Sequence, residues 1–61
     1  MTRVTIEKDE KLGDIIIIED IINKFYVAYT KNKQHIKVTE NNKTDAINEL
    51  KRIIHRLNPL D

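Results

Sequence analysis

The chain contains no cysteine, serine or tryptophan, and it has one glycine, one proline and two histidines among 61 residues. Without cysteine, disulfide bonds and thiolate zinc sites are excluded, which fits a reducing cytoplasm. Without serine or cysteine, the usual nucleophiles of acyl transfer are missing. A single glycine leaves no P-loop or dinucleotide fingerprint. We therefore expect no enzymatic activity, no catalytic residues, no cofactor and no metal site.

Long hydrophobic segments are also absent. The longest uninterrupted aliphatic run is Ile15–Ile18, which is far too short to cross a bilayer. The segment Met1–Thr5 lacks the apolar core of a signal peptide. We expect a soluble, cytoplasmic protein with no membrane partner.

The chain is instead rich in isoleucine, with eleven of these residues. Isoleucine is branched at Cβ and favours strands. A chain of this length forms one domain and buries only about 60% of the surface that its unfolded form exposes. Because disulfides are excluded, we expect stabilisation by a dense aliphatic core or by a partner chain.

Short strand-like segments occupy most of the chain before the helix described below. Residues 3–8 alternate polar and apolar side chains, which predicts a strand with Val4 and Ile6 on its buried face. Residues 14–19 contain four consecutive isoleucines, as in a strand with two apolar faces. Residues 19–24 fit either a loop or a longer strand, and both interpretations stay open.

Residues 25–30 and 34–39 predict a hairpin with its turn at Asn32-Lys33. The register that follows sorts the side chains into an apolar set and a mostly polar set, one on each face. The apolar set is Phe25, Val27, Tyr29, Ile36 and Val38, and the other set is Tyr26, Ala28, Thr30, His35, Lys37 and Thr39.

Residues 44–57 carry the one long helical pattern of the chain. Apolar side chains recur at spacings of three and four residues and form a single stripe. Thr44 is the expected N-cap, and the Asn58-Pro59 pair ends the helix. The stripe consists of Ala46, Ile47, Leu50, Ile53, Ile54 and Leu57.

The order of these elements predicts one small α+β domain over residues 1–61. It is an antiparallel sheet of three to four strands, in the order β-β-β-β-α or β-β-β-α. One C-terminal amphipathic helix packs on one face of the sheet, giving a two-layer sandwich.

The isoleucine run leaves one apolar face of this sheet without cover. If Ile16 and Ile18 face the helix beside Val4 and Ile6, the other two isoleucines face away. A partner chain could cover them, or loop residues such as Ile22 could fold over them, and both alternatives stay open. The candidate protein-interface residues are Leu12, Ile15, Ile17 and Ile21.

We expect a small protein-binding module that acts either as a homo-oligomer or as an inhibitor of a target protein. The alternative is a nucleic-acid-binding module, because basic and aromatic side chains on a sheet face can hold single strands. The candidate nucleic-acid residues are Lys24, Tyr26, Lys31, Lys33, His35 and Lys37.

An aromatic-rich strand ending in alanine (FYVA, 25–28) precedes a short strand (IKVTE, 36–40) and a threonine-led helix (TDAINEL, 44–50). This arrangement over residues 25–54 resembles the HicB-type antitoxin module, although the Pro- and Gly-containing segment typical between its strands is missing. The resemblance implies a toxin-neutralising or similar binding module that oligomerises. Separately, small cysteine-free domains of this type are common among phage and mobile-element products, so we expect such an origin. The strand-strand-strand-helix order also resembles the small DNA-binding module of some phage-type integrases, whose sheet reads DNA.

Overall fold

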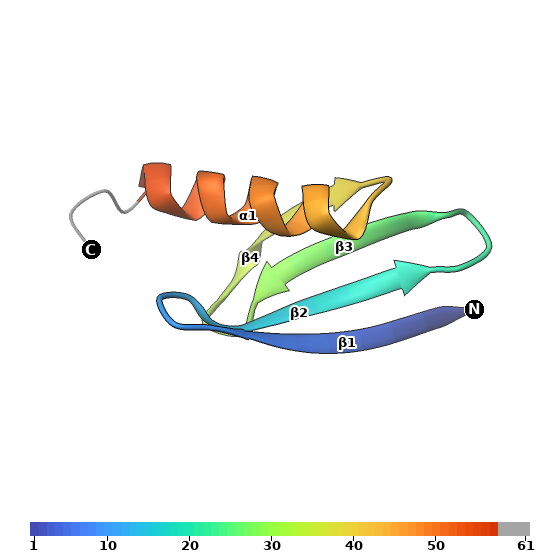
Figure 1. The fold of residues 1–61 in the computed structure, drawn as a ribbon, viewed down its shortest axis with the longest axis horizontal. Coiled ribbons are helices and arrows are strands. Elements are labelled where there is room, and N and C mark those ends of the chain that lie inside the picture. The colour runs from blue at the N-terminus through green and yellow to red at the C-terminus, as the bar shows by residue number, and fades with distance from the viewer. Residues whose placement is uncertain (58–61) are drawn as a thin grey trace.

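The computed structural model describes residues 1–57 and shows four strands followed by one helix (Figure 1). The four strands form one antiparallel sheet in the order β1-β2-β3-β4, and α1 packs on one side of it. The predicted α+β fold is therefore confirmed in its four-strand version. The elements are β1 (Thr2–Asp9), β2 (Gly13–Asp20), β3 (Phe25–Thr30), β4 (Lys33–Glu40) and α1 (Lys43–Leu57).

Aspartate side chains close the first two turns of the sheet. Oδ1 of Asp9 accepts hydrogen bonds from the backbone N–H of Lys11 at 2.8 Å and of Leu12 at 3.0 Å. Asp20 acts in the same way in the next turn, where its Oδ1 accepts from the N–H of Asn23 at 2.9 Å. This settles the open question about the middle segment, because β2 ends at Asp20 and residues 21–24 form a turn.

The N-cap of the helix lies two residues before the predicted one, and α1 begins at Lys43. Oδ1 of Asn42 accepts hydrogen bonds from the N–H of Thr44 at 2.8 Å and of Asp45 at 3.2 Å. Asn42 is therefore the N-cap, because asparagine fills this role as well as threonine does, and the prediction for Thr44 was wrong. The predicted stop at residues 58–59 lies outside the described residues.

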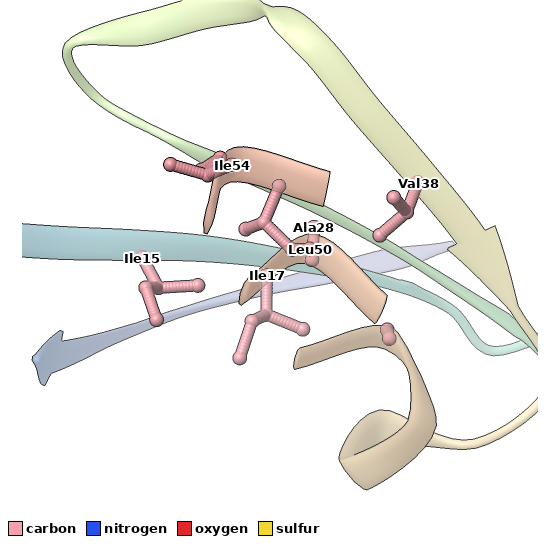
Figure 2. Close-up of a cluster of buried hydrophobic side chains, with 7 residues drawn as sticks. Ile15, Ile17, Ala28, Val38, Leu50 and Ile54 are labelled. Atoms are coloured by element: carbon pink, nitrogen blue, oxygen red, sulfur yellow. The ribbon is translucent and has the colours of Figure 1, made fainter. Parts of the chain in front are cut away.

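The hydrophobic core lies between the sheet and α1 (Figure 2). Every strand except β1 contributes at least one buried apolar side chain, and α1 contributes three of its stripe. Of the other stripe residues, Ile47 and Ile53 are half-buried against this cluster and Leu57 is exposed. The buried apolar residues are Ile15, Ile17, Ala28, Val38, Ala46, Leu50 and Ile54.

The isoleucine side chains of β2 lie on the opposite faces of the sheet from those predicted. Ile15 and Ile17 are each 2% exposed and face α1. Their neighbours therefore face away, because successive side chains of a strand alternate between faces. The cross-strand pairing brings the apolar residues of β1 to that same outer side. The apolar side chains that point away from α1 in β1 and β2 are Val4, Ile6, Ile16 and Ile18.

The position of the helix explains why β1 is turned in this way. The helix lies over β3 and β4, so the helix-side surface of β1 adjoins the flank of α1. Long charged side chains fit this flank: Glu7 Oε2 lies 2.6 Å from Lys43 Nζ, and Asp9 Oδ2 lies 3.2 Å from Lys51 Nζ. The acidic residues of β1 thus take the helix side, and its apolar residues are left on the other side.

The hairpin of β3 and β4 differs from its predicted register by one residue. Val27 pairs with Thr39 rather than with Val38, the turn falls at residues 31–32, and the pairing shifts between Ala28 and Thr30. The polarity sorting of the sequence failed because Ala28 lies opposite Ile17 of β2 and Val38 of β4, and both of these face α1. Ala28 and Thr30 are therefore buried on the helix side, where Tyr26 also packs against the core. The larger apolar residues of β3 are left outside: Phe25, Val27 and Tyr29.

Candidate protein interface

The sheet surface away from α1, hereafter the open face, carries two adjacent cross-strand rows. The strand register places Ile18 between Val4 and Val27 in one row, which ends in Thr39. The same register places Ile16 between Ile6 and Tyr29 in the next row. Apolar side chains therefore run continuously across β1, β2 and β3. The apolar members of the open face are Val4, Ile6, Ile16, Ile18, Phe25, Val27 and Tyr29.

The open face is accessible at its β1 side. Val4 is 61% exposed and Ile6 is 59% exposed, whereas Ile16 and Ile18 are partly covered by the strands on either side. Adjacent side chains on neighbouring strands cover each other's sides, but they do not cover each other from above. No described segment lies over this face, since α1 packs on the opposite one (Figure 1).

Polar groups border the apolar rows. At one end Lys8 of β1 pairs across the strands with Asp14 of β2, and at the other end Asp20 pairs with Phe25. On the β4 side, the Nζ of Lys37 lies 5.1 Å from the ring centroid of Tyr29, a cation–π arrangement. An apolar centre with a polar border is the usual anatomy of a protein–protein interface.

The structure places none of the four predicted interface residues on the open face. Ile15 and Ile17 lie under α1, so their predicted outward orientation was wrong. Leu12 is half-buried against the core, and Ile21 lies in the turn between β2 and β3. The structure has an uncovered apolar face, as predicted. In β2, however, Ile16 and Ile18 form it rather than Ile15 and Ile17. The sequence signal that indicates this orientation is the position of the acidic Glu7 on β1, which suits the basic flank of the helix.

The predicted nucleic-acid residues do not form one surface. Tyr26 lies on the helix side of the sheet, where its hydroxyl donates to Glu19 Oε2 at 3.4 Å. Lys37 lies on the open face, on the opposite side of the sheet from Tyr26. The rest are divided among the two ends of the sheet and β4: Lys24 in the β2–β3 turn, Lys31 in the β3–β4 turn, and Lys33 and the exposed His35 in β4.

A cavity of about 600 Å³ lies on the helix side, between the first turn and the C-terminal half of α1. Among the described residues that line it, Asp9 is the one carboxylate, and it already binds backbone N–H groups and Lys51. Hydrogen bonds from the N–H groups of Leu12 and Lys11, with the ammonium of Lys51, lower the pKa of Asp9. The carboxylate is therefore a structural charge at neutral pH. The cavity is lined by Asp9, Lys11, Leu12, Lys33, Lys51, Arg52, Ile54 and His55.

Arg52 of this cavity is also engaged. Its guanidinium donates to both carboxylate oxygens of Glu49, at 2.6 and 2.7 Å, and these contacts raise the pKa of Arg52. Within residues 1–57, no group of three or more His, Cys, Asp or Glu side chains is arranged to hold a metal ion. The same residues contain no helix with the length and hydrophobicity needed to span a bilayer.

Comparisons of this chain with protein families, with curated proteins and with solved structures gave no match. Within residues 1–57, the open face is an apolar surface that no other segment covers.

Proposed function

We propose that this chain is a small protein-binding module without enzymatic activity, and that the open face of the sheet is its contact surface. One observation carries the proposal: six apolar side chains form two continuous rows, with Phe25 beside them, on a sheet surface that no described segment covers. An exposed apolar patch bordered by polar groups favours a partner, because covering it removes apolar surface from water.

The partner is a second copy of the chain or a target protein that it inhibits. The second role is that of the HicB-type antitoxins, which residues 25–54 resemble, and it suits a protein encoded by a phage or mobile element. The lack of cysteine fits action in the cytoplasm.

Charge favours protein over nucleic acid as the partner of this face. Lys8 and Lys37 on the open face are balanced by Asp14 and Asp20, so its formal charges cancel. Binding to a nucleic-acid backbone depends on an excess of lysine and arginine facing the phosphates. A neutral apolar surface lacks that excess.

Site-specific photo-crosslinking in the cells that make the protein tests this proposal. A photoreactive phenylalanine analogue replaces Ile6, which lies on the β1 side of the open face. A matched variant carries it at Ile22, which is 71% exposed but lies in the β2–β3 turn. We expect a discrete protein adduct from position 6 and none from position 22. The absence of any adduct specific to position 6 would exclude the open face as a protein-binding surface.

A further inference from the structure

We infer that the partner of the open face is a second copy of this chain, packed sheet against sheet with the two helices outside. This inference rests on the proposed function and names the partner at the same surface. Size, charge and symmetry each support it.

The size of the open face sets what can cover it. Four strands of six to eight residues, spaced about 4.8 Å apart, cover about 500 Å². A specific interface buries at least about 1,000 Å² in total, or about 500 Å² from each partner. The partner must therefore cover nearly the whole face at once. A single extended strand or loop is too narrow for this, whereas a second sheet of the same dimensions fits.

The charge of the open face does not select an oppositely charged target. Two lysines and two aspartates lie on it, and Lys8 pairs directly with Asp14 across the strands. A strongly acidic or basic target gains little electrostatic attraction from such a surface. A second copy of the chain meets no net repulsion, and its apolar rows match those of the first.

A twofold axis lying between the two sheets, along the strands and midway between β2 and β3, aligns the apolar rows. Dimers with twofold symmetry bring the same patch of both subunits together. This rotation places Ile16 over Tyr29 of the second copy, and Ile18 over its Val27. Stacked sheets pack about 10 Å apart with their strands within about 30° of parallel, which suits these side chains. At the border, Ile6 lies over Lys37 of the second copy.

Sedimentation velocity of the purified chain tests the inference. The wild type is expected to shift from the 7.2 kDa mass of one chain to twice that mass as its concentration rises. The useful range is about 10 μM to 1 mM, because an interface of this size is expected at the weak end of specific complexes. Ile6→Lys is expected to stay at the mass of one chain. Ile6 is already 59% exposed, so circular dichroism of the variant should be unchanged. The matched control Ile22→Lys should associate like the wild type.

The substitution Ile6→Glu tests the orientation of the two copies. In the inferred arrangement a glutamate at position 6 faces Lys37 of the second copy, whereas a lysine there faces a like charge. Ile6→Glu should therefore still reach twice the mass of one chain within the same concentration range, in which Ile6→Lys remains a single chain. Equal dissociation of the two variants would overturn this arrangement.

The failure of the dimer and the failure of the proposed function give different results. A wild type that remains a single chain at about 1 mM overturns the dimer. In that case, a crosslink from position 6 to another protein in cells keeps the binding function and identifies a target instead. Equal loss of association in the position-6 variants and in Ile22→Lys would also overturn the inference, because the open face would then have no special role.

Discussion

The two faces of this sheet are built from the same kinds of residue and differ in what covers them. On the helix side, Ile17 and Ala28 are fully enclosed beneath α1. On the open side, Ile18 and Val27 occupy neighbouring positions of the same strands without a layer above them. Hydrophobicity alone therefore does not decide which face of this sheet becomes the core. The core forms on the face where Ile17, Ala28 and Val38 lie opposite one another across β2, β3 and β4.

Truncating a residue of the covered face should have the largest effect. Leu50 is 0% exposed at the centre of the α1 stripe, and Leu50→Ala should lower the free energy of unfolding by about 2–5 kcal/mol. Ile6→Ala on the open face should cost less than about 1 kcal/mol in the single chain, because little is packed around it. Urea denaturation at low protein concentration measures both. A larger cost at Ile6 would contradict the assignment of the two faces.

A conservative substitution of Thr30, on the covered face, should change the stability in the opposite direction from Leu50→Ala. Thr30 is buried on the helix side, and its Oγ1 has no hydrogen-bond partner among the described residues. Thr30→Val keeps the shape and removes an unpaired hydroxyl, so it should raise the free energy of unfolding by about 1 kcal/mol. The matched control is Thr39→Val, whose side chain lies at the solvent-exposed edge of the open face. It should be close to neutral, and a loss of stability in Thr30→Val would show that the hydroxyl has a partner.

Acid should weaken the turns at both ends of β2. Hydrogen bonds from the backbone of Leu12 and Lys11 hold the pKa of Asp9 below its ordinary value of 3.8, and those from Asn23 do the same for Asp20. Because the pKa values in the folded chain lie below the unfolded ones, both carboxylates stabilise the fold above about pH 4. This contribution is lost as the pH falls through the lowered values.

Urea denaturation between about pH 2 and 6 measures this loss. The double variant Asp9→Asn/Asp20→Asn should be less stable than the wild type at pH 6, and its stability should change less on acidification. Parallel profiles for the two proteins would show that other carboxylates cause the acid sensitivity.

The sequence predicted the elements of this fold better than it predicted their faces. The helical stripe around Leu50 has a period that no strand shares, so α1 and its buried side could be identified directly. Four consecutive isoleucines show no alternation of apolar and polar residues. The segment alone therefore does not indicate whether Ile15 or Ile16 faces the helix, and the position of the neighbouring strand decides it. The prediction then assumed that Val4 and Ile6 are buried because they are apolar.

That assumption failed for a reason that lies outside any single segment. The helix crosses over β3 and β4, and the helix-side residues of β1 interact with its flank through ion pairs such as Glu7–Lys43. The burial of Ala28 likewise depends on how closely α1 approaches the sheet. Local sequence patterns do not encode that distance. An uncovered apolar face was thus predicted, but Ile15 and Ile17, which were assigned to it, lie under the helix.

The order of the strands has a consequence for how quickly the chain finds its structure. Each strand pairs only with strands adjacent to it in the chain, and residues 41–42 alone separate β4 from the helix. Closing such short segments costs little loop entropy, and proteins rich in local contacts fold fastest. Individual hairpins form in about 1–10 μs. We expect a single chain to refold within milliseconds, so that the sheet, with its open face, is complete before two dilute chains meet.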